Sequence, residues 1–457
     1  MAVVGCLLLL GLVGGGSSGP ETAAGPVARS AGAARPTASP ASSAAPTAPS
    51  PVLAAAVAAA DTAPSAAGVA ASVAGLLADS RLGSRVSATV VDAATGTVLL
   101  DHGAAQLATP ASTAKLATAT ALLAAVPPDT RLVTQVRSGS TTGEVVLVGG
   151  GDPTLSAAGP AEPTTYPGAA RISALAAAVR RTHVGAVTRV VVDGSLFSGD
   201  RTASGWLPDD IPGGYVAPIT AVMVDAGRQP GTTARSAKPD IAAGRALATA
   251  LGAPAAAVVR GTAPASSRLL GQVRSAPVVD LIEQTLQASD NVLAEALARQ
   301  VAIAEKQPAS FTGAVQAVRT VLGRLGAPVA GLDLVDGSGL SGMDKVSPQF
   351  LAAMLRQAVG AANPRLHALV PALPVGGYDG TLDKRYRSGT TRLGAGRVRA
   401  KTGTLDGVSS LAGLVSDQTG RLLVFVVIAD RVPIGGTLGA EAALDKIATA
   451  LAGCGCR

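Results

Sequence analysis

The chain has 457 residues, which is long enough for two domains with substantial cores. It is 48% hydrophobic but only 2% aromatic, so its cores must be built from aliphatic side chains. The net charge is +7, but the arginines are spread along the chain without forming a run, which argues against a nucleic-acid partner. The three histidines are far apart and no Cys/His cluster has zinc spacing, so we expect neither a metal nor another cofactor.

The first 66 residues have the composition of a targeting segment followed by a tether. Residues 1–16 contain an apolar stretch that resembles the core of a secretory signal, although no Lys or Arg precedes it. Residues 17–66 are rich in Pro, Ala, Ser and Thr and bury too little apolar surface to offset the entropy of ordering, so we expect a disordered linker. We therefore predict an exported, extracytoplasmic protein, with membrane-tethering by a longer uncleaved anchor as the alternative to a cleaved signal. The net positive charge would draw such a protein to anionic surfaces, so it could also be cell-wall associated.

The first elements of a folded domain are predicted just after this linker. Alternating apolar residues predict a strand over 86–92 and a returning strand over 97–101, which together form a hairpin. An Ala- and Leu-rich helix follows over 113–126 and ends before two prolines. Ser112 would then lie at the N-terminus of this helix, with Lys115 one turn further along the same face.

The remaining elements suggest one domain that is interrupted by another. In chain order they are predicted as a strand over 144–148, a helix over 172–181, a strand over 189–193, a helix over 278–304 that pauses near residue 290, strands over 397–405 and 421–430, and a helix over 440–452. Because the elements at both ends of the chain suit a single unit of sheet and helices, we expect a discontinuous catalytic domain over 67–131 and 273–457. Residues 132–272 would form an inserted domain.

Three short motifs occur in an order that points to one kind of chemistry. The chain holds only seven lysines and two asparagines, yet these rare residues fall in Ser112-Thr113-Ala114-Lys115, Ser289-Asp290-Asn291 and Lys401-Thr402-Gly403. Taken singly, the motifs are typical of a surface helix pair, a turn or cap, and a hairpin shoulder. Together they form the Ser-x-x-Lys, Ser-Asp-Asn, Lys-Thr-Gly set of penicillin-interactive serine enzymes.

The first motif supplies the groups that attack on an amide carbonyl requires. A serine hydroxyl is a poor nucleophile until a base removes its proton. Lys115 is the candidate base for Ser112, but a free lysine titrates near ~10.4 and must be largely neutral to accept a proton. Burial and a second cation both lower the pKa of a lysine, and Lys401 is the obvious second cation.

The second motif offers proton transfer and orientation. Ser289 can relay a proton to the amine that leaves the substrate. Asn291 can hold Lys115 and the substrate amide by hydrogen bonds. Both residues are therefore candidate catalytic groups.

The third motif suits substrate binding on an edge strand. Lys401 and Thr402 can bind the carboxylate of the substrate, and Gly403 lets backbone approach backbone. The backbone N–H groups of Ser112 and Thr404 are the candidate donors to the oxyanion that forms during attack.

At these residues the sequence resembles the low-molecular-mass class C penicillin-binding proteins, the D-alanyl-D-alanine carboxypeptidase/endopeptidases. Further family-like segments lie at 147–155, 289–295, 336–341, 380–382 and 400–413. The resemblance implies an α+β penicillin-binding/β-lactamase-like transpeptidase fold, with an antiparallel sheet flanked by helices and an inserted mixed α/β domain. It implies a serine DD-peptidase that hydrolyses the terminal D-Ala-D-Ala bond of peptidoglycan stem peptides and is inhibited by β-lactam antibiotics, with cleavage of cross-links left open.

One position departs from the family pattern. Gly342 stands where the family often carries an arginine that borders the pocket for the peptide side chain. The preferred third residue of the stem peptide therefore stays open.

Two other functions compete with this interpretation. A serine β-lactamase would use the same motifs, but the long stretch between Ser112 and Ser289 and the lack of an obvious deacylating glutamate motif argue against it. A catalytically silent wall-binding protein would share the fold, but intact Ser112, Lys115, Ser289 and Lys401 argue against that.

The cysteines do not indicate a function. Cys454 and Cys456 end the chain, and a bridge between residues two apart would be strained. We expect these thiols to be free or paired elsewhere.

Overall fold

The computed structural model describes residues 63–183 and 185–456. The expected signal over 1–16 and all but the end of the expected linker over 17–66 lie outside the described residues. Of the helices that the structure describes, none is both long enough and apolar enough to cross a membrane.

One sheet joins the two ends of the described chain. Its five strands run in the order β10-β11-β12-β1-β2, and every neighbouring pair is antiparallel. The strands are β1 (Val86–Asp92), β2 (Val98–His102), β10 (Val398–Leu405), β11 (Val408–Ser416) and β12 (Leu422–Ala429). Strand β1 lies beside β12, with Val90 opposite Phe425, so the predicted hairpin and the predicted closing strands belong to the same sheet.

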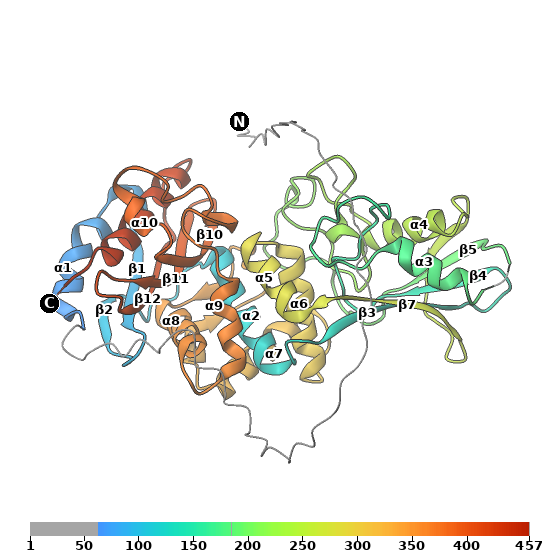
Figure 1. Cartoon of the computed structure of the whole chain (residues 1–457), viewed down its shortest axis with the longest axis horizontal. Helices are drawn as coiled ribbons and strands as arrows, with labels where there is room; N and C mark the ends of the chain where they lie inside the picture. Colours follow the sequence, from blue (N-terminus) through green and yellow to red (C-terminus); the bar gives the residue numbers. More distant parts are fainter. Residues whose placement is uncertain (1–62, 184, 457) are drawn as a thin grey trace, which may run out of the picture. The chain divides into compact units, whose positions relative to one another are not determined.

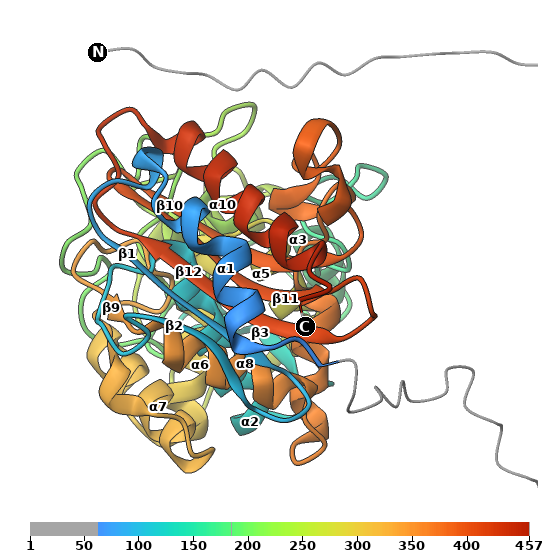
Figure 2. The ribbon, with the colours of Figure 1, turned by 90° about the vertical axis from the view of Figure 1, so that its left-hand side faces the viewer.

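Helices cover both faces of this sheet. The helices α1 (Ala66–Leu77) and α10 (Thr437–Ala452) lie side by side over one face (Figure 2). Alternate residues of β12 divide between the two faces: Phe425 packs toward α1 and α10, whereas Val426 packs toward the helices opposite. This alternation follows from the two-residue period of a strand.

The opposite face carries a group of helices that includes those holding the first two motifs. They are α2 (Lys115–Ala125), α5 (Val278–Gln287), α6 (Asn291–Ala304), α7 (Phe311–Arg324) and α8 (Pro348–Val359). Nearly every residue of α2 is buried. A helix that is apolar or small on all sides is suited to the centre of a core, which explains why its Ala, Leu and Thr residues tolerate this position.

A second sheet is formed entirely by residues 131–277. Its order is β6-β5-β4-β3-β7, and it mixes parallel and antiparallel pairs. The strands are β3 (Arg131–Ser138), β4 (Glu144–Val148), β5 (Arg189–Asp193), β6 (Ala257–Arg260) and β7 (Leu269–Pro277). Helices α3 (Ile172–Arg180) and α4 (Pro239–Ala250) lie beside this sheet (Figure 1). They share an aliphatic core with it. Within the described residues, none of its strands pairs with the first sheet.

The two longest strands of the second sheet connect it to the helices of the first. Strand β3 follows α2, and β7 runs directly into α5 (Figure 1). Arg131 pairs with Pro277, at the ends of the two strands that adjoin those helices. The second sheet thus extends past the boundary expected at residue 272. Its loops also pack on α6, where Met223 joins a buried cluster with Leu293.

The remaining elements are short. They are β8 (Leu332–Asp333), β9 (Lys345–Val346) and α9 (Leu369–Ala372), together with single 3-10 turns such as Ala111–Ala114 and Gly380–Leu382. The expected helix over 113–126 therefore begins two residues earlier, as a 3-10 turn that continues into α2. Cys454 and Cys456 form a disulfide with each other, so the expectation that these thiols are free or paired elsewhere was wrong.

Candidate active site

The turn that carries Ser112 is fastened to the edge of the first sheet. Ala111, just before it, has a φ of 48°, a left-handed conformation that few alanines adopt. The carbonyl oxygen of Pro110 accepts hydrogen bonds from Thr113 Oγ1 at 2.7 Å and from Ser410 Oγ at 2.6 Å. These contacts hold the turn against β11 and fix where the Ser112 hydroxyl points.

Lys115 is fully buried and makes three hydrogen bonds. Its Nζ donates to Ser112 Oγ at 2.9 Å, to Asn291 Oδ1 at 2.6 Å and to the carbonyl oxygen of Ser338 at 2.7 Å. Burial lowers the pKa of Lys115 to about 8, although neighbouring carboxylates act in the opposite direction. A neutral amine at this position could receive the Ser112 proton, because the two atoms are already within hydrogen-bond distance.

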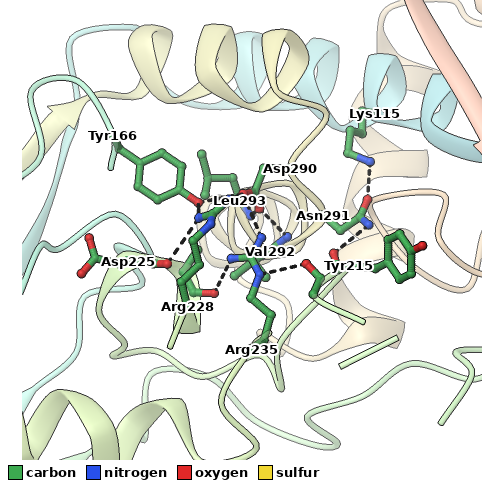
Figure 3. A network of polar contacts seen from close by, with 12 residues as sticks. Lys115, Tyr166, Tyr215, Asp225, Arg228, Arg235, Asp290, Asn291, Val292 and Leu293 are labelled. Atoms are coloured by element: carbon green, nitrogen blue, oxygen red, sulfur yellow. Dashed lines mark hydrogen bonds and ion pairs between the residues drawn. The ribbon is translucent and has the colours of Figure 1, made fainter. Parts of the chain in front are cut away.

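The second motif contributes two side chains from the junction of α5 and α6. Ser289 has a φ of 53°, and its Oγ accepts a hydrogen bond from Lys401 Nζ at 2.9 Å. Asn291 is the first residue of α6; its Nδ2 donates to the carbonyl oxygen of Tyr215 at 3.0 Å while its Oδ1 accepts from Lys115 (Figure 3). These opposite partners define the orientation of the Asn291 amide.

The third motif lies on β10, at the edge of the first sheet. Lys401 is fully buried, and its Nζ also donates to the carbonyl oxygen of Thr402 at 2.8 Å. Burial, and then the positive charges of Lys115 and Arg385, hold the pKa of Lys401 well below its usual range. The hydroxyls of Thr402 and Thr381 lie 2.9 Å apart, which ties the 380–382 segment to the motif.

Gly403 brings β10 into contact with the turn of the nucleophile. A Cβ at this position would lie 2.3 Å from Ser410 Oγ, 2.6 Å from the carbonyl oxygen of Pro110 and 3.1 Å from the backbone N of Ser112. Only glycine permits this approach. Thr404, the next residue, is exposed and donates from its Oγ1 to Glu441 Oε1 at 3.1 Å.

Several groups at the site were not predicted from the sequence. The carbonyl of Ser338 is held by a loop in which Asp336 Oδ1 accepts from the N–H of Ser338 at 2.9 Å. Glu295 accepts from the N–H of Gly337 beneath the same loop, at 3.0 Å. Burial, and then the charge of Asp336, raises the pKa of Glu295 to about 8. The family-like segment over 336–341 could have drawn attention to this loop, but no side-chain pattern marks a backbone carbonyl as a lysine acceptor.

The structure thus brings the predicted groups of all three motifs into two hydrogen-bonded sets. Ser112, Lys115 and Asn291 are linked by hydrogen bonds, and Ser289 and Lys401 form a second pair. The roles assigned to these residues, and to Thr402, Gly403 and Thr404 in binding, remain predictions.

The chain belongs to the D-Ala-D-Ala carboxypeptidase 3 (S13) family, whose profile matches residues 69–238 and 228–451. Among relatives, it is 44% identical over 385 residues to a carboxypeptidase from Mycobacterium tuberculosis, an alignment that covers 83% of this chain and 82% of the relative.

Among solved structures, the fold is similar to that of penicillin binding protein 4 from Haemophilus influenzae. That match has a TM-score of 0.68 and 23% identity, and it covers 83% of this chain and 97% of the other. The same protein in complex with a β-lactam matches with a TM-score of 0.61 and 22% identity, over 84% of this chain and 98% of the other. At these identities the comparison shows the fold alone, and it confirms the expected α+β penicillin-binding fold.

Proposed function

We propose that this protein is a serine D-Ala-D-Ala carboxypeptidase that acts on peptidoglycan stem peptides through an acyl-enzyme on Ser112. Membership of the carboxypeptidase family supports the reaction class. The observation that carries the assignment to Ser112 is its hydrogen bond to a fully buried lysine, at 2.9 Å, with a lysine pKa of about 8. An ordinary surface lysine would stay protonated at neutral pH and could not serve as a base.

Acylation begins when Lys115 Nζ takes the proton from Ser112 Oγ. As an ammonium, Lys115 uses its three donors on three acceptors; as a neutral amine, it keeps two donors and gains a lone pair directed toward the serine. Asn291 Oδ1 and the Ser338 carbonyl can therefore hold the amine in place while its lone pair faces Ser112. The deprotonated oxygen attacks the carbonyl carbon of the penultimate D-alanine.

The tetrahedral intermediate needs donors for its oxyanion and a proton for its leaving group. The backbone N–H groups of Ser112 and Thr404 supply the donors, because Gly403 brings β10 against the Ser112 turn. Ser289 relays to the amine of the leaving D-alanine the proton that Lys115 took from Ser112, so Lys115 is neutral again when the leaving group departs. Collapse of the intermediate breaks the C–N bond and leaves the ester on Ser112, which water then hydrolyses.

Substrate recognition falls to the third motif. The substrate ends in a carboxylate, and the side chains of Lys401 and Thr402 provide a cation and a hydroxyl for it. A β-lactam carries a similarly placed carboxylate and a reactive amide, so we expect penicillin to acylate the same serine. The similar fold of a protein that was solved with a β-lactam supports this expectation.

We further propose that residues 132–272, with the end of β7, act as an inserted domain that shapes access of the peptide. The separate second sheet and its own aliphatic core support this division. Because peptidoglycan lies outside the cytoplasm, we propose that the protein is exported and works at the cell wall, either free or membrane-tethered.

The test is turnover of a stem pentapeptide that ends in D-Ala-D-Ala. The wild-type protein should release one D-alanine per peptide, and Ser112→Ala should release none above the uncatalysed rate. A β-lactamase would instead hydrolyse penicillin rapidly without releasing D-alanine. Release by Ser112→Ala at the wild-type rate would contradict the proposal.

A further inference from the structure

The middle residue of the second motif does not face the reacting groups. Asp290 is buried between its two catalytic neighbours, and its Oδ1 caps α6 by accepting from the N–H groups of Val292 at 2.9 Å and Leu293 at 3.2 Å. A cap needs only one carboxylate oxygen. The second oxygen, Oδ2, is therefore available for other partners.

All three partners of that second oxygen come from the inserted segment. Asp290 Oδ2 accepts from Tyr166 Oη at 2.7 Å, from Arg228 at 3.0 Å and from Arg235 at 3.4 Å (Figure 3). Arg228 also donates to the hydroxyl of Tyr166 and stacks on its ring. Burial alone would raise the pKa of Asp290, but Arg235 and Arg228 hold it at about 2, so the carboxylate is charged throughout the physiological range.

Arg235 connects this carboxylate to a second contact with the active site. It is buried, and its guanidinium donates through separate nitrogens to Asp290 Oδ2, to the carbonyl oxygen of Ala226 at 2.7 Å and to that of Gly214 at 3.1 Å. The residue after Gly214 is Tyr215, whose carbonyl accepts from Asn291 Nδ2. Arg235 thus contacts the 214–215 segment, whose Tyr215 carbonyl accepts from Asn291. It also contacts Asp290, the residue that directly precedes Asn291 in the chain.

We propose that Arg235 and Asp290 are positioning residues through which the inserted segment fixes the Asn291 amide against Lys115. The inference rests on the proposed function, since it concerns a residue of that reaction. Held between the Tyr215 carbonyl and Lys115 Nζ, Asn291 presents its oxygen to the lysine. If the amide turned over, its NH₂ group would face the amine and the acceptor would be lost.

The variants Asp290→Asn and Arg235→Met remove the two halves of this link. The amide side chain introduced by Asp290→Asn would keep a good helix cap but direct an NH₂ group at two guanidinium groups. Displacement of a catalytic group by about 1 Å costs up to 10²-fold in rate, so each variant should lower the rate of penicillin acylation roughly tenfold to a hundredfold. The double variant should fall well short of the product of the two losses, because both changes break one link.

The chain offers a matched control in the same segment. Asp240 is also a buried aspartate at the start of a helix, and it pairs with Arg201 at 3.0 Å and Arg260 at 2.6 Å. Asp240→Asn should therefore weaken the fold through the same chemistry. It should leave the acylation rate within about twofold of wild type, because Asp240 bonds neither to α6 nor to the 214–215 peptide.

The pH profile of acylation separates positioning from mere loss of structure. The titratable groups that act on the pKa of Lys115, or whose pKa Lys115 affects, are Asp336, Glu295, Asp290, Asp344 and Lys401. Burial lowers the pKa of Lys115, and the negative charge of Asp290 acts against that. Asp290→Asn should therefore move the acid limb of the profile to lower pH. Arg235→Met removes a positive charge that pairs with Asp290, so it should move the limb in the opposite direction, to higher pH. Asp240→Asn should not move it.

Two results would overturn the proposal. One is acylation at the wild-type rate in both Asp290→Asn and Arg235→Met. The other is a lower acylation rate in both variants while the acid limb of the pH profile does not shift. If wild-type protein itself is not acylated, the proposed function fails, and amide hydrogen exchange at Val292 and Leu293 then decides the link. Faster exchange there in Arg235→Met than in Asp240→Asn would support the link between the insert and α6. Equal exchange in the two variants would overturn it.

Discussion

The two buried lysines of the site lie in contrasting surroundings. Lys115 has hydrogen-bond acceptors from three separate segments and carboxylates nearby, whereas Lys401 has two acceptors and only cations among the charged groups that affect it. Burial lowers the pKa of both side chains. The neighbouring acids limit that effect at Lys115, while neighbouring cations add to it at Lys401.

This difference suggests separate tasks for two chemically identical side chains. A lysine with a pKa of about 8 can release and accept a proton near neutral pH, as a base must. A lysine that lacks an anionic partner is stabilised as a cation when a substrate brings its own carboxylate. The contrast in surroundings therefore assigns Lys115 to proton transfer and Lys401 to substrate binding.

The largest effect is expected from Lys115→Arg. A guanidinium keeps the positive charge but cannot give up its proton. General-base catalysis is worth roughly 10²–10⁴-fold, so acylation by penicillin should fall by about 10³-fold or more. Stopped-flow or gel-based labelling with a fluorescent penicillin would measure this rate. Retention of near wild-type acylation would remove Lys115 from the role of base.

The second effect is the pH dependence of the wild-type protein. Because only neutral Lys115 can take the proton and burial lowers its pKa to about 8, the acylation rate should rise with pH and level off above about pH 8. Between pH 6 and the plateau the increase should be about a hundredfold, since the neutral fraction grows tenfold per pH unit below the pKa. A rate that is flat from pH 6 to pH 9 would speak against a lysine base.

The third effect concerns Lys401. Replacing it with methionine removes the cation for the substrate carboxylate while keeping a long side chain. Loss of one member of a buried charge pair typically costs 2–5 kcal/mol, so kcat/KM for a free-acid peptide should fall by about thirtyfold or more. The same peptide with its carboxylate amidated serves as the control. If the variant lost the same factor on both peptides, Lys401 would not be the carboxylate partner.

A smaller effect is expected from Gly403→Ala. The added Cβ would need space that Ser410 and Pro110 occupy at 2.3 and 2.6 Å, so β10 must move away from the Ser112 turn. We expect acylation to fall about tenfold, part of the cost of losing an oxyanion donor. Gly75→Ala is the matched control, because nothing lies within 4 Å of its Cβ position. Equal rates for both variants would show that the close approach is not needed.

The sequence was sufficient for the motifs and for some of the elements with clear periodicity, although the amphipathic helices α7 and α8 were not predicted. The strands β4 and β5 were predicted with their observed bounds, and the hairpin of β1 and β2 nearly so. Strand β11 was not predicted. It is buried on both faces and includes small residues such as Ser409 and Gly413, so it shows no alternation of polar and apolar positions.

At the site, the side chains within the motifs were predictable from the sequence, but the groups that position them were not. Ser338 acts through its backbone carbonyl, which any residue could supply. Arg235 is one of many arginines, and only the fold brings it to Asp290. A motif indicates the groups that react, whereas the groups that position them depend on long-range packing, which one sequence does not reveal.

The most direct test of Ser112 as the nucleophile is the location of the covalent adduct that penicillin forms. Intact-mass spectrometry of the treated protein should show a single addition of the mass of the penicillin. Peptide mapping should place that addition on the peptide that contains Ser112, and Ser112→Ala should show no addition. An adduct on another serine, such as Ser289, or an adduct that persists in Ser112→Ala, would contradict the assignment of Ser112 as the nucleophile.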